Sequence, residues 1–102
     1  MSQTTTNTNE FLITFKKPFT FEGKEYKDVD ISGIEKLTTS DLIEADGQFG
    51  QTGQFAVMNE MTIGYACIVG AQASDKPVEF FQQLPAVEGV KLKRIVMGFF
   101  NN

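Results

Sequence analysis

The sequence predicts an α+β fold, in which an N-terminal antiparallel β-hairpin is followed by a bundle of three to four α-helices. β-branched and aromatic residues alternate with polar ones across residues 10–31, on both sides of Gly23. A helix-start pattern follows at 37–42. Further along, residues 54–71 and 87–100 carry apolar side chains at helical spacing. Because strands come first and helices follow, the two kinds of element are segregated as in α+β proteins.

The two predicted strands flank the glycine turn. Residues 10–16 form the first strand, which Pro18 either ends or confines to a sheet edge, and residues 19–21 form a short extension. Residues 25–31 form the second strand, and a break in its alternation predicts a bulge near 27–28. A lone hairpin is marginal in water, so we expect this one to pack against the helices.

The first predicted helix has the clearest local signal in the chain. Thr38 at the N-cap places Asp41 at the third helical position, which is a capping box with Asp in place of Glu. Leu37 and Leu42 are spaced as a hydrophobic staple across this cap. We expect this helix to span 39–46.

The next two segments differ sharply in composition. Residues 47–53 contain three glycines, so we expect a loop or hinge that begins where the first helix stops at Gly47. Residues 54–71 are the most apolar stretch and predict a buried central helix that ends at Gly70. Cys67 lies within this stretch, and we expect it to be buried as a small hydrophobic residue.

Two further helices complete the prediction. A start signal, with Ser74 or Asp75 as the cap and Pro77 in the first turn, predicts a short helix over 78–84. The last helix is predicted over 87–100. Its apolar side chains fall on one stripe, formed by Leu92, Ile95, Val96, Phe99 and Phe100.

Length and termini indicate one domain, which we place at residues 10–102. Residues 1–9 are polar, carry no charged side chain and predict a disordered leader rather than a signal peptide. No apolar stretch approaches the ~20 residues that a membrane helix needs, so we expect no membrane association.

The residue types in the chain exclude several kinds of catalytic and binding site. The chain has no His and a single Cys, so it has neither an imidazole base nor the thiols for a disulfide. Two carboxylate pairs, Asp28 with Asp30 and Asp41 with Glu44, share predicted faces, but nothing in the sequence desolvates them. We therefore expect no enzymatic activity, no metal site and no cofactor.

Charge is unevenly distributed along a chain of net charge −4. Residues 28–60 contain seven acids and one base, whereas basic residues gather in 16–27 and 91–94. These clusters form either solvated faces of opposite sign, or a basic end and an acidic middle that favour self-association or the steering of a partner. An acidic chain with few exposed bases is not expected to bind nucleic acid.

Phenylalanine is unusually frequent, with ten in 102 residues. Two adjacent pairs fall in predicted helices, and we expect one ring of each pair in the core and the other on an adaptable, exposed surface together with methionine. The candidate partner-binding residues are Met58, Met61, Phe80, Phe81, Phe99 and Phe100.

Several short motifs resemble those of phage tail assembly chaperones, the small proteins encoded just before the tape measure protein. The resemblance covers residues 11–100 and rests on the aromatic first strand with Pro18. It also rests on the segments 23–26 (GKEY), 28–31 (DVDI), 37–45 (LTTSDLIEA), 84–85 (LP) and 96–100 (VMGFF). Glu88 stands where many of these proteins carry an acidic residue before the last helix, although Gly89 follows it here.

The resemblance implies a non-enzymatic function in virion assembly. The chain would bind the long helical tape measure protein, with the tail tube protein as a further partner, in the bacterial host cytoplasm. It would be absent from the mature virion. The alternative is a structural or adaptor component of a phage tail or related particle, and in either case the chain itself could form homo-oligomers.

Overall fold

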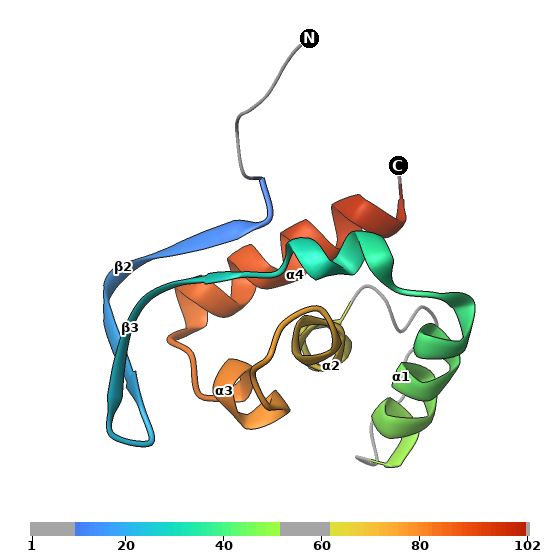
Figure 1. The fold of residues 1–102 in the computed structure, drawn as a ribbon, viewed down its shortest axis with the longest axis horizontal. Coiled ribbons are helices and arrows are strands. Elements are labelled where there is room, and N and C mark those ends of the chain that lie inside the picture. Colours follow the sequence, from blue (N-terminus) through green and yellow to red (C-terminus); the bar gives the residue numbers. More distant parts are fainter. Residues whose placement is uncertain (1–9, 52–61, 102) are drawn as a thin grey trace, which may run out of the picture.

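The computed structural model describes residues 10–51 and 62–101. Its elements confirm the α+β fold, with a hairpin first and helices after it (Figure 1). In chain order they are β2 (Leu12–Phe21), β3 (Lys24–Asp30), a 3₁₀ helix η1 (Ser32–Lys36), α1 (Thr39–Gln51), α2 (Ile63–Gln72), α3 (Val78–Gln82) and α4 (Ala86–Phe100). The leader predicted at 1–9 and the candidate residues Met58 and Met61 lie outside the described residues.

The two strands pair antiparallel, with Leu12 opposite Asp30 at one end and Phe21 opposite Lys24 at the other. A two-residue turn joins them, and both of its residues have positive φ, which is the geometry that fits the twist of a hairpin. The register breaks between Thr14 and Phe19. Four residues of β2, including Pro18, therefore lie opposite a single residue of β3.

The predicted bulge is therefore on the wrong strand. We expected it in the second strand near 27–28, but the extra residues belong to β2. Pro18 explains the difference, because it has no N–H to donate to the partner strand and lies within the irregular stretch. The strand resumes beyond it at Phe19, so Pro18 sits in an edge strand rather than ending it.

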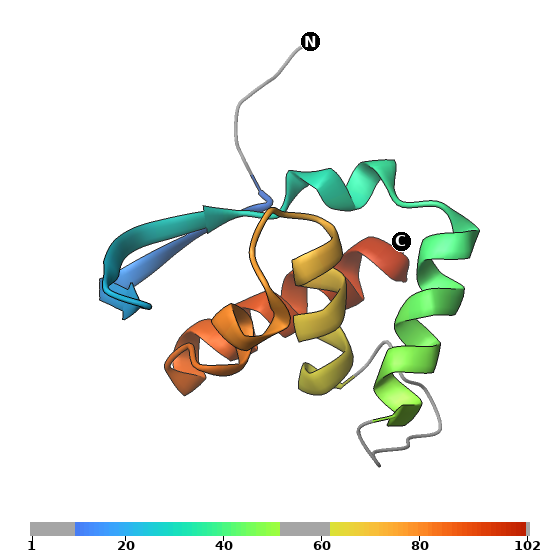
Figure 2. The same cartoon turned by 60° about the horizontal axis from the view of Figure 1, so that its bottom comes forward.

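Helix α2 is the centre of the fold. It has six consecutive buried residues, Tyr65–Gly70, because α1, α3, α4 and η1 all pack against it. Figure 1 looks down α2, with the hairpin on one side and α1 on the other, and Figure 2 shows α4 crossing it. Gly70 does not end the helix as predicted. A Cβ there would lie 3.2 Å from the Phe81 ring and 3.3 Å from Leu92, so this glycine allows close packing and α2 continues to Gln72.

The start of α2 also differs from the prediction. The central helix was expected from residue 54, but Thr62 is in an extended conformation and its Oγ1 accepts a hydrogen bond from the Tyr65 N–H at 3.1 Å. Thr62 is thus the N-cap, and the helix begins at Ile63.

Helix α1 is confirmed at its start and corrected at its end. The Thr38 N–H donates to the Asp41 carboxylate at 2.8 Å and the Asp41 N–H donates to Thr38 Oγ1 at 3.3 Å, which is the predicted capping box. The helix then passes through Gly47 and continues to Gln51. Phe49, buried in the core, holds this last turn in place against the low helix propensity of glycine.

The short helix α3 begins without the predicted side-chain cap. Pro77 itself is the N-cap residue, and neither Ser74 nor Asp75 takes that position. Ser74 Oγ instead donates to the Gly70 carbonyl at 2.8 Å and accepts from the Lys76 N–H at 3.2 Å, which shapes the end of α2.

Helix α4 agrees with the prediction to within one residue, and Leu92 and Val96 of its apolar stripe are fully buried. Cys67 is buried as expected. Within residues 10–51 and 62–101, no helix has the length and apolar character needed to cross a membrane.

Candidate functional site

Phe80 and Phe81 belong to the core, which corrects the prediction that one of the two rings is exposed. Their exposed fractions are 0% and 2%. The Phe80 ring makes edge-to-face contacts with Phe19, Phe21 and Tyr26 of the hairpin, at centroid distances of 5.3, 5.4 and 5.0 Å. The prediction failed because the hairpin covers α3 on one side while α2 lies against it on the other, so neither ring is available to a partner.

Phe99 and Phe100 are both half-buried, so this pair is not divided into one core ring and one exposed ring either. The Phe99 ring contacts Phe11 at 6.0 Å and Phe100 at 5.4 Å, in both cases edge to face. The structure therefore does not gather the described candidate residues into one surface. Of these, Phe99 lines a hollow, at the C-terminal end of α4.

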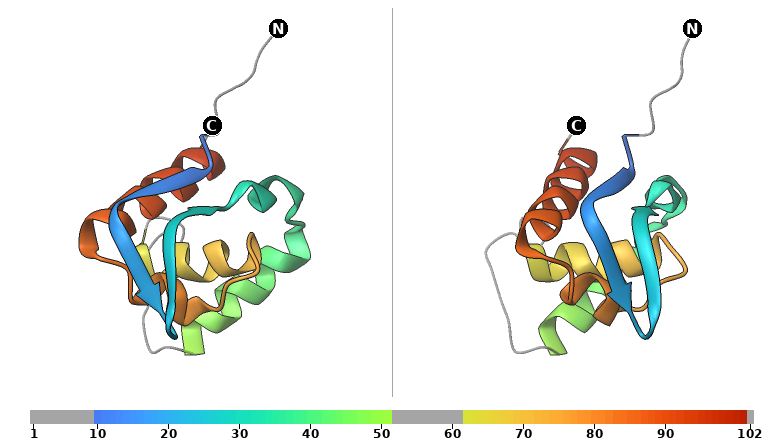
Figure 3. Two further views of the ribbon diagram at one scale, coloured as in Figure 1. Left: turned by 60° about the vertical axis from the view of Figure 1, so that its left-hand side comes forward. Right: turned by 90° about the vertical axis from the view of Figure 1, so that its left-hand side faces the viewer.

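That hollow is one of three that adjoin along α4 where the helix runs beside β2 (Figure 3). Their volumes are about 410, 370 and 480 Å³, and Arg94 lines all three. We call this continuous surface the α4–β2 groove. The residues that line it include Leu12, Val87, Val90, Arg94, Ile95 and Phe99.

The groove exposes aliphatic side chains between cations. Val87 is 43% exposed, and Leu12 and Val90 are each 36% exposed. Lys16 and Arg94 line the end of the groove beside Val87 and Val90. At the opposite end, beside Phe99, the groove is lined by Glu10 and Glu35 as well as by Arg94.

Sequence reasoning missed this surface, although α4 carried a signal for it. Val87, Val90 and Arg94 recur at positions i, i+3 and i+7, which is a second stripe beside the buried one. The strand that forms the other wall is far away in sequence, so the stripe alone could not identify a groove.

A buried carboxylate fixes the two walls of the groove to each other. Glu88, in the first turn of α4, is 2% exposed, and its Oε2 accepts a hydrogen bond from the Lys16 N–H at 2.9 Å. Its Oε1 lies 3.0 Å from Lys91 Nζ, which also donates to the Thr14 carbonyl at 3.1 Å. Two side chains of α4 thus bind two backbone groups at the irregular stretch of β2.

The surroundings of Glu88 stabilise the ionised form of its carboxyl group. Burial alone would raise the pKa of this carboxyl, but the Lys16 N–H and the Lys91 ammonium outweigh burial and hold the pKa below its ordinary value. The family resemblance would place Glu88 before the last helix, but Glu88 lies inside that helix and joins it to the hairpin.

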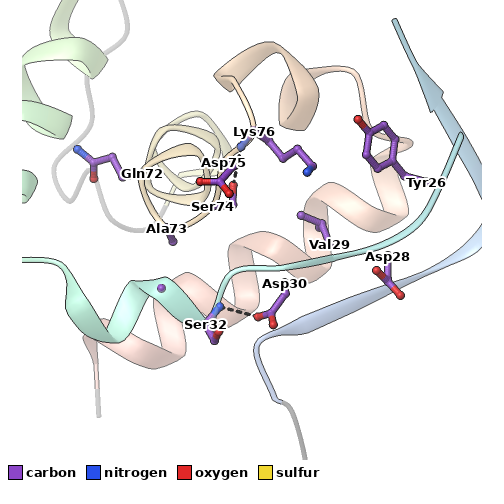
Figure 4. Close-up of a pocket in the computed structure, with 11 residues that line it drawn as sticks. Tyr26, Asp28, Val29, Asp30, Ser32, Gln72, Ala73, Ser74, Asp75 and Lys76 are labelled. Carbon is purple, nitrogen blue, oxygen red and sulfur yellow. Dashed lines mark hydrogen bonds between the residues drawn. The ribbon is translucent and has the colours of Figure 1, made fainter. Parts of the chain in front are cut away.

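A separate hollow, of about 480 Å³, opens between β3 and the connection from α2 to α3 (Figure 4). Its lining is mainly polar and includes Asp28, Asp30 and Asp75. Asp30 accepts a hydrogen bond from the Ser32 N–H at 2.8 Å, and the Lys76 ammonium lies 5.2 Å from the centroid of the Tyr26 ring. These contacts stabilise the start of η1 and the β3 surface.

The thiol of Cys67 is a potentially reactive group, but it is buried in the core. Burial raises the pKa of the Cys67 thiol to about 11, which disfavours the reactive thiolate at neutral pH. Throughout the described part of the chain, no three His, Cys, Asp or Glu side chains are grouped so that they could hold a metal ion.

Comparisons with protein-family models, with curated proteins and with solved structures gave no match.

Proposed function

We propose that this protein is a phage tail assembly chaperone, which binds the tape measure protein and promotes tail assembly without enzymatic activity. The observation that carries the proposal is the α4–β2 groove, with three exposed aliphatic side chains between cations. The motif resemblance supplies the identity of the partner, and the groove supplies a surface of suitable chemistry.

The groove fits one side of a helix. From Val87 to Phe99 it spans twelve residue steps of α4, or roughly 18 Å at the rise of an α-helix. A partner helix of about three turns can lie along it and bury its apolar face against Leu12, Val87 and Val90. Because these side chains are few and only partly exposed, binding is expected to be weak and reversible, as the release of a client during assembly requires.

The proposal places the protein in the bacterial host cytoplasm during assembly, with the tail tube protein as a second candidate partner. It is expected in complexes from infected cells and absent from purified virions. Mass spectrometry of purified particles separates this function from that of a structural or adaptor component, which would remain in the particle.

The direct test is co-expression with the tape measure protein of the same phage or prophage. We expect the wild-type chain to keep the tape measure protein soluble and to co-purify with it. Val90→Asp, which places a carboxylate in the groove, is expected to abolish co-purification. Ile43→Asp is the matched control, because it changes an exposed hydrophobic residue on α1, outside the groove. An insoluble tape measure protein that does not co-purify with the wild type would disprove the proposal.

A further inference from the structure

We propose that the outer edge of strand β3 binds a basic, extended segment of another protein, which adds to the hairpin as a third strand. The segment pairs with the backbone of β3 and carries lysine or arginine at alternate positions. This inference goes beyond the proposed function and does not depend on it, because the α4–β2 groove lies along the other strand of the hairpin.

The backbone of β3 has an outer edge with no strand beside it. In the described part of the chain the sheet consists of β2 and β3 alone, so each strand pairs on one side only. The Ile31 N–H donates to the Phe11 carbonyl at 2.9 Å, which identifies these two residues as a hydrogen-bonded pair. Because such pairs alternate along an antiparallel ladder, Thr14 and Asp28, three positions away, form a pair that is not hydrogen-bonded. The N–H and C=O groups of both residues therefore point out of the hairpin.

The two outer edges of the hairpin differ in what their backbone groups meet. On the β2 side, the Thr14 carbonyl accepts a hydrogen bond from Lys91 of α4. The Lys16 N–H, on the same side, donates to Glu88. On the β3 side, the outward N–H and C=O of Asp28 have no such partner among the described residues. A strand edge in this state is a template for pairing with another chain.

The polar hollow of about 480 Å³ lies along this open edge (Figure 4). One of its walls is β3, and the other is the connection from α2 to α3. In Figure 4 the side chain of Val29 points toward Lys76 of that connection, whereas the side chains of Asp28 and Asp30 point the other way. A strand added beside β3 would therefore enter the hollow and place every second side chain next to the two aspartates.

Charge determines the chemistry of the added segment. The hollow is lined by the carboxylates of Asp28, Asp30 and Asp75 and, among the described residues, by a single ammonium, that of Lys76. This ammonium lies 5.2 Å from the centroid of the Tyr26 ring, which holds it at one end of the hollow. Opposite charges on neighbouring strands favour pairing and like charges oppose it. The segment is therefore basic, with lysine or arginine at the positions that face Asp28 and Asp30.

Nuclear magnetic resonance of the isotope-labelled full chain tests the inference. The probe is a capped peptide of about seven residues, the length of an ordinary strand, in which lysine alternates with valine. We expect the Asp28 amide resonance to shift with a dissociation constant below about 1 mM. The hydrogen exchange of that amide should slow at least about tenfold, because its N–H donates to the added strand. An Asp28 amide that neither shifts nor gains protection at several millimolar peptide would overturn the inference.

Two control peptides separate strand pairing from attraction between charges. With glutamate in place of lysine, the peptide should bind at least about tenfold more weakly. The lysine peptide with methyl groups on the backbone nitrogens that face β3 can no longer donate to the strand, and it should weaken by a similar factor. Equal binding by the methylated and unmethylated peptides would exclude strand addition.

Asp28→Lys and Glu25→Lys are a matched pair of variants. Both reverse the charge of an exposed acid on β3, but Asp28 lines the hollow and Glu25 does not. With both variants folded by circular dichroism, Asp28→Lys should weaken binding of the lysine peptide at least about tenfold and Glu25→Lys less than about twofold. Equal effects of the two substitutions would mean a general attraction to an acidic chain and would rule out this site.

The readout also distinguishes other occupants of the edge. Protection of the Asp28 amide that rises with protein concentration, without peptide, would identify a second copy of the chain there and contradict the assignment to a basic segment. The measurements involve neither the tape measure protein nor the α4–β2 groove, so failure of this inference and failure of the proposed function are distinguishable.

Discussion

At the scale of single residues, the least expected feature is the buried carboxylate of Glu88. In sequence it is one acid near a helix start, where the helix dipole already favours negative charge. In the fold it bridges α4 to β2 through the Lys16 N–H and pairs with Lys91. The Lys16 N–H lies where the pairing of β2 with β3 is interrupted, so the Glu88 carboxylate supplies its acceptor.

Glu88→Gln is expected to lower the free energy of unfolding by about 1–3 kcal/mol at pH 7, because the amide keeps an acceptor for Lys16 but loses the ion pair. Chemical denaturation with urea measures this change. Glu79→Gln, at an exposed position on α3, is the control and should be nearly neutral.

The lowered pKa of Glu88 predicts how the free energy of unfolding depends on pH. Because the pKa of Glu88 is lower in the folded chain than in the unfolded chain, its contribution is fully present above about pH 4.3, the ordinary value for Glu. The contribution is lost as the pH falls through the folded pKa. Stability below pH 4.3 should therefore fall more steeply in the wild type than in Glu88→Gln, and parallel curves for the two proteins would contradict this role.

At the scale of elements, the capping box located the start of α1, whereas glycine did not locate the ends of α1 and α2. The capping box of Thr38 and Asp41 formed as expected, since its hydrogen bonds join residues three apart. Gly47 and Gly70 were expected to end helices and do not, because buried side chains farther along the chain hold the next turn. Glycine lowers helix propensity by only about 1 kcal/mol, which tertiary packing overrides.

Two glycines with opposite surroundings give a paired prediction at this scale. Gly47→Ala should raise the free energy of unfolding by roughly 0.5–1 kcal/mol, because its helical position has open space for a Cβ. Gly33→Ala should destabilise the protein, because its Cβ would meet the backbone carbonyl of Ala73 at the end of α2. Thermal unfolding of both variants checks the two signs, and equal shifts would show that propensity rather than packing decides.

At the scale of the whole molecule, the order of elements was predictable and the α4–β2 groove was not. Alternation and helical spacing are local patterns, so the hairpin and α4 could be located from the sequence. The α4–β2 groove depends on which helix lies beside β2, and no local pattern carries that information. One ring of the α3 pair is expected on a surface from the sequence for the same reason, since the strands that cover the pair are some sixty residues earlier in the chain.

This arrangement makes Phe80 a residue that joins the hairpin to α3. Its ring contacts three hairpin rings and the neighbouring Phe81 ring. Phe80→Ala is therefore expected to cost about 3–5 kcal/mol, a large share of the ~5–15 kcal/mol that stabilises a typical domain.

Phe99→Ala is the matched comparison, because it removes a ring of the same size from a half-buried position at the end of α4. It should cost less, about 1–2 kcal/mol, since less apolar surface returns to water. Urea unfolding followed by circular dichroism measures both losses. Equal losses would mean that the contacts of Phe80 with the hairpin rings add no more stability than a half-buried ring on α4 does.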